Sequence, residues 1–131
     1  MTGQSMPQNR MILHGQLLWL GLSAFWNIAG VLLIGQGMRA IGPTASLPLA
    51  AILLIVGGVM YWAHSRMNFI YVLLSLLAIF AAGSAVLNAF TADPALWPSE
   101  FWRLAGAALN AFGTLCSAAA VLIAIRSFLN R

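Results

Sequence analysis

Two histidines are the side chains of this sequence best suited to holding a cofactor. His14 lies near the start of the first long apolar segment, and His64 lies at the end of the second, in the stretch YWAHSR. Helical spacing places Gly57, Tyr61 and His64 on one face. If the two segments are adjacent helices, His14, Tyr61 and His64 can meet at one depth. Paired imidazoles often hold a b-type haem and also suit zinc or copper, so these three residues are candidate cofactor ligands and haem b is the candidate cofactor.

The alternative interpretation places both histidines at a membrane interface, where they bond to water or lipid headgroups. No certain metal site is predicted from the sequence. The single cysteine, Cys116, allows neither a CxxC motif nor a disulfide within one chain. Both acidic residues fall outside the apolar segments. This disfavours a proton-coupled antiporter, because such a protein needs a titratable group within the membrane.

Asparagines inside apolar segments form the second candidate site. Asn27 lies in the first segment and Asn110 in the last, each on a stripe of small or polar residues spaced three or four apart. Ser23 shares the stripe of Asn27, and Ser117 shares that of Asn110. The ~1.5 Å rise per residue puts the two asparagines at a similar depth. Either they bond to each other across a helix interface, for ~0.6–2 kcal/mol, or the polar set lines a cavity for a small ligand.

The elements that position these residues are predicted from composition. The chain has 131 residues, of which 62% are hydrophobic and 6% charged, whereas soluble domains carry about 25% charged residues. Apolar segments run at about 11–34, 47–63, 69–90 and 104–125, and each approaches the ~20 residues that cross a bilayer. They are too long for barrel strands, and in lipid every backbone amide must be bonded internally. We expect an all-α membrane protein, with a polar N-terminus over 1–10 and a single bundle of four transmembrane helices over 11–131.

The charges orient the expected bundle in the bilayer. The net charge is +4, but the arginines are scattered singly at helix ends, which is not the pattern of a nucleic-acid-binding patch. One side of the bundle carries Arg10, Arg66, Arg126 and Arg131. The other side carries Arg39, Arg103, Asp93 and Glu100. The positive-inside rule therefore predicts cytoplasmic termini. We expect the bundle to lie in the cell (inner) membrane.

Small residues form stripes on the later segments. The last segment carries Gly106, Asn110, Gly113, Ser117, Ala120 and Ala124 on one face. The third carries Ser75, Ala78, Ala82, Ala85 and Ala89. Small residues let membrane helices approach closely, and there are more such faces than one small bundle obviously needs. We expect the lipid bilayer and further copies of the chain as partners, with a larger membrane complex as the alternative.

The stretch RMILHGQLLWLGLSAFWNIAGVLL resembles the start of the hydroxylaminobenzene mutase and styrene oxide isomerase family, whose first helix also begins with His-Gly. The likeness extends loosely through AILLIVGGVMYW and TLCSAAAVLIAIR. It implies an oligomeric four-helix membrane enzyme that rearranges a small aromatic substrate, with haem b as Lewis acid and no net redox change. The family's histidine and asparagine of the second helix align with Ala45 and Ala51, so no catalytic residue is carried over.

Three functions are consistent with these observations. The first is an intramembrane isomerase or mutase that acts on a small apolar aromatic substrate. The second is a non-catalytic small subunit that docks through its small-residue stripes against a larger membrane complex. The third is a small oligomeric transporter or channel for an uncharged solute, with Asn27 and Asn110 along the path. The third is the least favoured, because the end of the last helix, AAAVLIAI, is poor in polar residues.

Overall fold

The computed structural model describes residues 5–131, with side chains from residue 9 onward. It consists of long helices α1 (Ser5–Gly35), α2 (Leu47–Arg66), α3 (Asn68–Thr91) and α4 (Glu100–Leu129), and a short 3-10 helix η1 (Pro94–Leu96). No strand occurs among the described residues. Each long helix is long and apolar enough to cross a membrane, which confirms the predicted all-α architecture with four candidate membrane spans. Residues 5–10 of the expected polar N-terminus continue α1, and residues 1–4 lie outside the described residues.

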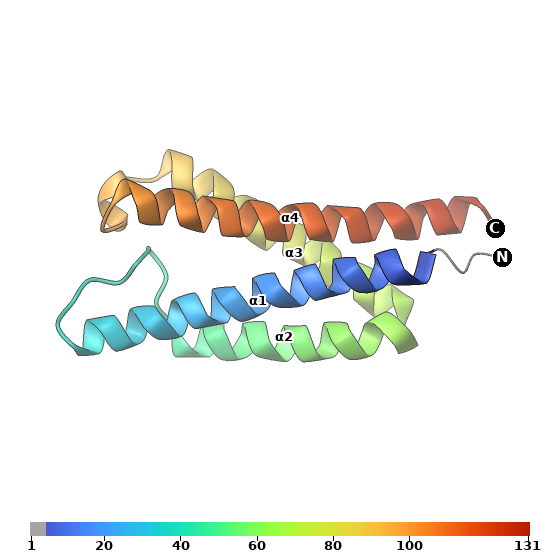
Figure 1. Cartoon of the computed structure of the whole chain (residues 1–131), viewed down its shortest axis with the longest axis horizontal. Coiled ribbons are helices and arrows are strands. Elements are labelled where there is room, and N and C mark those ends of the chain that lie inside the picture. The colour runs from blue at the N-terminus through green and yellow to red at the C-terminus, as the bar shows by residue number, and fades with distance from the viewer. Residues whose placement is uncertain (1–4) are drawn as a thin grey trace.

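The four helices pack in a ring. Helix α1 contacts α2 and α4, while α3 contacts α4 and α2. Figure 1 shows α3 crossing the bundle obliquely from the end of α2 to the start of α4. The start of α1 and the end of α4 lie at the same end of the bundle, which we call the terminal end (Figure 1). The 36–46 connection and η1 lie at the opposite end, which we call the loop end.

Local signals set the limits of the helices. Gly37 adopts φ 77°, a left-handed conformation that glycine adopts easily, and the chain turns there after α1. Ser46 caps α2, because its hydroxyl accepts a hydrogen bond of 3.2 Å from the backbone N–H of Leu49. A single residue, Met67, separates α2 from α3. The short turn forces these two helices to be antiparallel neighbours.

The interior of the bundle is built from the small-residue stripes. A Cβ atom on Gly113 would overlap the indole ring of Trp19 on α1, and one on Gly30 would lie 2.9 Å from Ala45 Cβ. The buried members of the α3 stripe are Ser75, Ala78, Ala82 and Ala89. The outward faces carry large apolar side chains such as Phe69 and Leu115, which are 78% and 70% exposed and suited to contact lipid.

These contacts show where the stripes are used. The α4 stripe packs against α1 through Gly113 and Ser117, and the α3 stripe is largely buried in the same interior. The small residues of these stripes therefore pack against helices of the same chain. The Trp19 ring of α1, for example, lies directly against Gly113 of α4. A contact with a second copy of the chain or with another protein would have to use a different, outward face.

Candidate functional site

A cavity of about 250 Å³ lies near the loop end of the bundle. We call it the amide cavity, because Asn27 on α1, Asn88 on α3 and Asn110 on α4 all line it. Its aromatic lining residues are Trp19, Trp26 and Trp97. Pro43 and Thr44 of the 36–46 connection also border it. Leu49 and Leu53 of α2 complete the lining, so the cavity lies between all four long helices and a loop, and its residues come from distant parts of the chain.

The asparagine amides are bonded, but not to each other. Asn27 Nδ2 donates to Ser23 O over 3.0 Å, and Asn27 Oδ1 accepts from the backbone N–H of Ser46 over 3.2 Å. Asn110 Oδ1 accepts from Trp19 Nε1 over 3.2 Å, and Asn110 Nδ2 donates to Gly106 O over 2.9 Å. The alternative of an Asn27–Asn110 bond is wrong for this structure, because each amide finds a partner closer along the chain or on a neighbouring element.

These bonds leave part of each amide available. A carboxamide has two N–H donors and two acceptor lone pairs. In Asn27 and in Asn110, one donor and one lone pair are used by the contacts described. The remaining donor and acceptor of each side chain can serve a molecule in the cavity. The site is therefore able to form paired hydrogen bonds with an uncharged polar group.

Ser23 gives this cavity its most informative atom. Ser23 lines the cavity, and its hydroxyl oxygen is buried without a hydrogen-bond partner in the described part of the chain. It is the single buried side-chain oxygen or nitrogen found in that condition among the described residues. Leaving such a group unsatisfied costs roughly 1–3 kcal/mol. The oxygen itself is covered by its neighbours, so a molecule in the cavity reaches it only if the lining shifts.

The tryptophans give the cavity rigid aromatic walls. Trp19 is 3% exposed and Trp97 is 6% exposed, so both rings are held by packing. Trp26 meets Trp102 edge to face, with ring centroids 5.8 Å apart. No side chain that is charged or titrates near neutral pH lines the cavity. Its chemistry is that of aromatic faces, carboxamides and hydroxyl groups.

Ser117, the fourth residue of the expected polar set, belongs to a different cluster. Gln16 on α1 is fully buried, and its Nε2 donates to Ser75 Oγ over 3.0 Å and to Ser117 Oγ over 3.2 Å. Tyr71 Oη donates to Gln16 Oε1 over 2.6 Å. This central polar cluster ties α1, α3 and α4 together, and its hydrogen bonds satisfy both donors of Gln16. Its role is interhelical bonding in the middle of the bundle.

The pairing of Gln16 with Tyr71 was not predicted from the sequence. A signal was present, since Tyr71 and Ser75 lie four residues apart at the start of the predicted third helix and share one face. Their opposition to Gln16 depends on the oblique course of α3, which periodicity does not encode.

The candidate cofactor ligands do not gather as expected. His14 is exposed on α1, and the Tyr61 side chain is 63% exposed on the outside of α2. His64 instead contacts the Tyr71 ring edge to face, with centroids 5.0 Å apart. Leu13 and Gln16 lie on the buried face of α1. His14 therefore projects from a different face of the helix, away from the core. No group of three or more His, Cys, Asp or Glu side chains converges within residues 9–131.

These positions do not fit a haem held inside the bundle by His14, Tyr61 and His64. Helices α1 and α2 pack directly, and a Cβ atom on Gly57 would already lie 3.7 Å from Leu17 and Leu20 side-chain atoms. No space for a macrocycle lies between the helices at that contact, so these three residues do not enclose a haem in this arrangement.

Comparison with protein-family models, with curated proteins and with solved structures finds no match for this chain.

Proposed function

We propose that this protein is a small integral membrane protein that binds a small, uncharged, ring-containing molecule in the amide cavity. The tryptophan rings and asparagine amides that line one cavity carry the proposal, and the hydroxyl of Ser23 beside them has no hydrogen-bond partner among the described residues. The free hydrogen-bonding capacity of Asn27 and Asn110 lies along the same cavity. A ligand that combines an aromatic ring with a neutral polar group complements all three.

The volume of the cavity limits the size of the ligand. A dry apolar cavity of ~150 Å³ admits benzene. The amide cavity, at about 250 Å³, has room for one ring and a short polar substituent. Sites for drug-sized ligands begin at ~300 Å³, so a larger multi-ring molecule exceeds this cavity.

The resemblance to the mutase and isomerase family supports the same class of ligand, a small apolar aromatic compound. Rearrangement of the bound compound is the first alternative to simple binding. The lining supplies amide and hydroxyl groups, which can polarise a substrate oxygen, and no His, Asp, Glu, Cys or Lys side chain for acid–base catalysis. Binding without a proton transfer by a lining residue is therefore the function that the cavity chemistry supports.

Passage of the solute through the bundle is the second alternative, and one observation favours it. Buried polar side chains occur beyond the amide cavity as well, since Gln16, Ser75 and Ser117 lie in the middle of the bundle. A second cavity opens at the terminal end. Polar residues of α1 and α3 therefore supply the hydrogen-bonding groups that the apolar end of α4 lacks. The arginine distribution supports cytoplasmic termini and the cell (inner) membrane for either alternative.

Binding of benzamide to the detergent-solubilised protein tests this proposal by isothermal titration calorimetry. Benzamide joins one ring to one carboxamide, and we expect saturable binding at one site per chain. Ala85→Phe places a ring inside the cavity and should abolish the heat of binding. The neighbouring Ser84→Phe places the same ring on the exposed face of α3 and should bind as the original protein does. Absence of saturable binding, or equal binding by Ala85→Phe, contradicts the proposal.

A further inference from the structure

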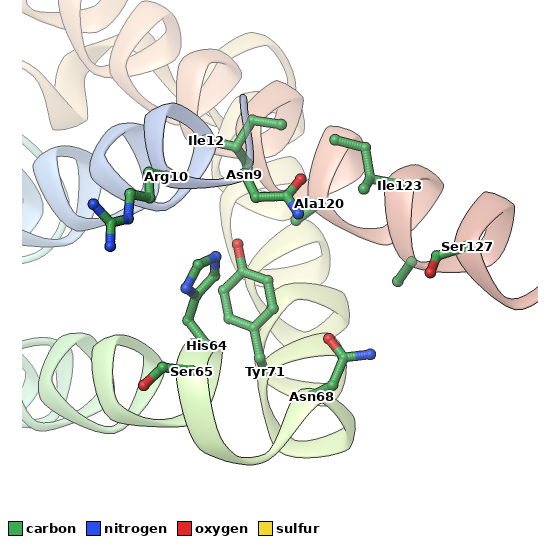
Figure 2. A pocket seen from close by; sticks show the side chains of 11 residues that line it. Asn9, Arg10, Ile12, His64, Ser65, Asn68, Tyr71, Ala120, Ile123 and Ser127 are labelled. Atoms are coloured by element: carbon green, nitrogen blue, oxygen red, sulfur yellow. The ribbon is translucent and has the colours of Figure 1, made fainter. Parts of the chain in front are cut away.

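All four long helices line a second cavity, of about 320 Å³, at the terminal end of the bundle (Figure 2). We call it the terminal cavity. It is separate from the amide cavity, because the two share no lining residue. Figure 2 shows His64 on α2 and Tyr71 on α3 side by side, both directed toward α1. Tyr71 joins the floor of this cavity to the central polar cluster through its bond to Gln16.

The terminal cavity has two chemically different sides. Arg10, His64 and Ser65 lie on one side of it in Figure 2, and they supply a guanidinium, an imidazole and a hydroxyl. The α4 residues Ile123 and Ala124 form an apolar wall, and Ser127 of the same helix adds one hydroxyl at its outer end. A molecule that fills this space must therefore present a polar, hydrogen-bond-accepting part to α1 and α2, and an apolar part to α4.

The charge around the terminal cavity is positive and uncompensated. The chain contains only two acidic side chains, Asp93 and Glu100, and both lie at the loop end. Arg103 at that end pairs with Glu100. Arg10 therefore has no acidic side chain of its own chain within reach. An anionic group from outside the chain is the partner that its guanidinium lacks.

We propose that the terminal cavity binds one anionic phospholipid, with the phosphate between Arg10 and His64 and an acyl chain along Ile123 and Ala124. The guanidinium binds phosphate oxygens through two parallel N–H groups, and the polar edge of the His64 ring borders the same space. Basic pockets between transmembrane helices, at the level of the headgroups, are typical sites for anionic lipids. The proposal is independent of the amide cavity and of the ligand of that cavity.

Native mass spectrometry of the full chain in mild detergent tests the assignment. The probes are dioleoyl phosphatidylglycerol, which is anionic, and dioleoyl phosphatidylcholine, which has the same chains and no net charge. We expect one phosphatidylglycerol to remain bound per chain and phosphatidylcholine to bind at least about tenfold more weakly. Both lipids carry the phosphate, but the choline cation neutralises it and is repelled by the Arg10 guanidinium. Arg10→Gln should weaken phosphatidylglycerol binding by a similar factor.

A matched control separates a built site from general surface charge. Arg126→Gln removes the same charge on the exposed surface of α4 at the same end, outside the cavity, and should leave lipid binding unchanged. Ala124→Trp fills the apolar side without altering the charge and should also abolish binding. Far-ultraviolet circular dichroism verifies that each variant is folded.

Three results would overturn the proposal. The first is equal loss of phosphatidylglycerol by Arg10→Gln and Arg126→Gln, which would indicate diffuse attraction. The second is unchanged binding in Ala124→Trp. The third is displacement of the lipid by millimolar inorganic phosphate, which would identify a site for the free anion and not for a lipid.

Discussion

The contact between Gly113 and Trp19 leads to a sharp prediction about stability. A Cβ atom added by Gly113→Ala would overlap three atoms of the Trp19 indole ring. The ring has no room to retreat, because Trp19 is 3% exposed and its Nε1 is bonded to Asn110 Oδ1 over 3.2 Å. The helices α1 and α4 must therefore separate, or the indole must leave its rotamer and lose that bond.

Three effects set the magnitude of the change. Overpacking a well-filled interior costs typically ~1–3 kcal/mol. Loss of an interhelical hydrogen bond adds ~0.6 kcal/mol in a membrane protein. The higher helix propensity of alanine opposes these two effects and stabilises the helix by up to ~1 kcal/mol, or by less where neighbouring helices already hold it. We expect Gly113→Ala to lower the free energy of unfolding by about 1–2 kcal/mol.

Gly83→Ala is the matched control for this substitution. Gly83 lies in the interior of α3, and a Cβ atom there would have no heavy atom within 4 Å outside its own helix. The free energy of unfolding of both variants can be compared by tryptophan fluorescence during titration of mixed micelles with sodium dodecyl sulfate. Gly83→Ala should match or slightly exceed the original stability. Equal stability of the two variants would refute the packing of α4 against α1 described here.

The other predictions concern hydrogen bonds, and the first two use the same unfolding assay. Gln16→Leu removes the three bonds of the central polar cluster, so we expect the unfolding free energy to fall by about 2 kcal/mol at ~0.6 kcal/mol per bond. Tyr71→Phe should lower it by ~0.6 kcal/mol, while Tyr61→Phe, on the exposed surface, should not change it; a reversed order would contradict the assignment of the inward tyrosine. Asn110→Ala frees the Trp19 indole N–H and removes an amide from the cavity, so benzamide binding in the calorimeter should weaken about tenfold, and unchanged affinity would exclude Asn110 from the site.

Length and apolarity were sufficient to predict the four helices, because only a helix satisfies a backbone of that composition in lipid. The predicted first and last residues of the helices were less accurate. Helix α1 already includes Ser5 and α4 extends to Leu129, beyond the predicted 11–34 and 104–125. Apolar runs mark the part of a helix inside hydrocarbon, and polar turns of the same helix continue outside it.

The site was only partly predictable. Periodicity placed Ser23, Asn27 and Asn110 on inward faces, and the structure brings all three to the amide cavity. The same reasoning grouped Ser117 with them, although it bonds Gln16 at a different depth. Side-chain partners depend on which helices are neighbours and how they cross, and periodicity gives neither.

The small-residue stripes and the candidate cofactor ligands show the same limit. Spacing identified the stripes as contact surfaces, but it did not indicate that α1 of the same chain covers the α4 stripe. The cofactor interpretation assumed that His14 faces α2, whereas the inward turn of Leu13 directs it outward. A one-residue difference in helical phase is about 100° of rotation, which is enough to move a side chain from the core to the lipid.

The most direct test of ligand binding in the amide cavity is photolabelling. A benzamide that carries a diazirine on its ring is photolysed with the detergent-solubilised protein, and the labelled positions are identified by peptide mass spectrometry. We expect labels within residues 19–27 of α1 and 106–110 of α4, suppressed by an excess of unlabelled benzamide. Labels confined to residues exposed on the outside of the bundle, such as Phe80 and Leu115, and insensitive to competition, would contradict binding in this cavity.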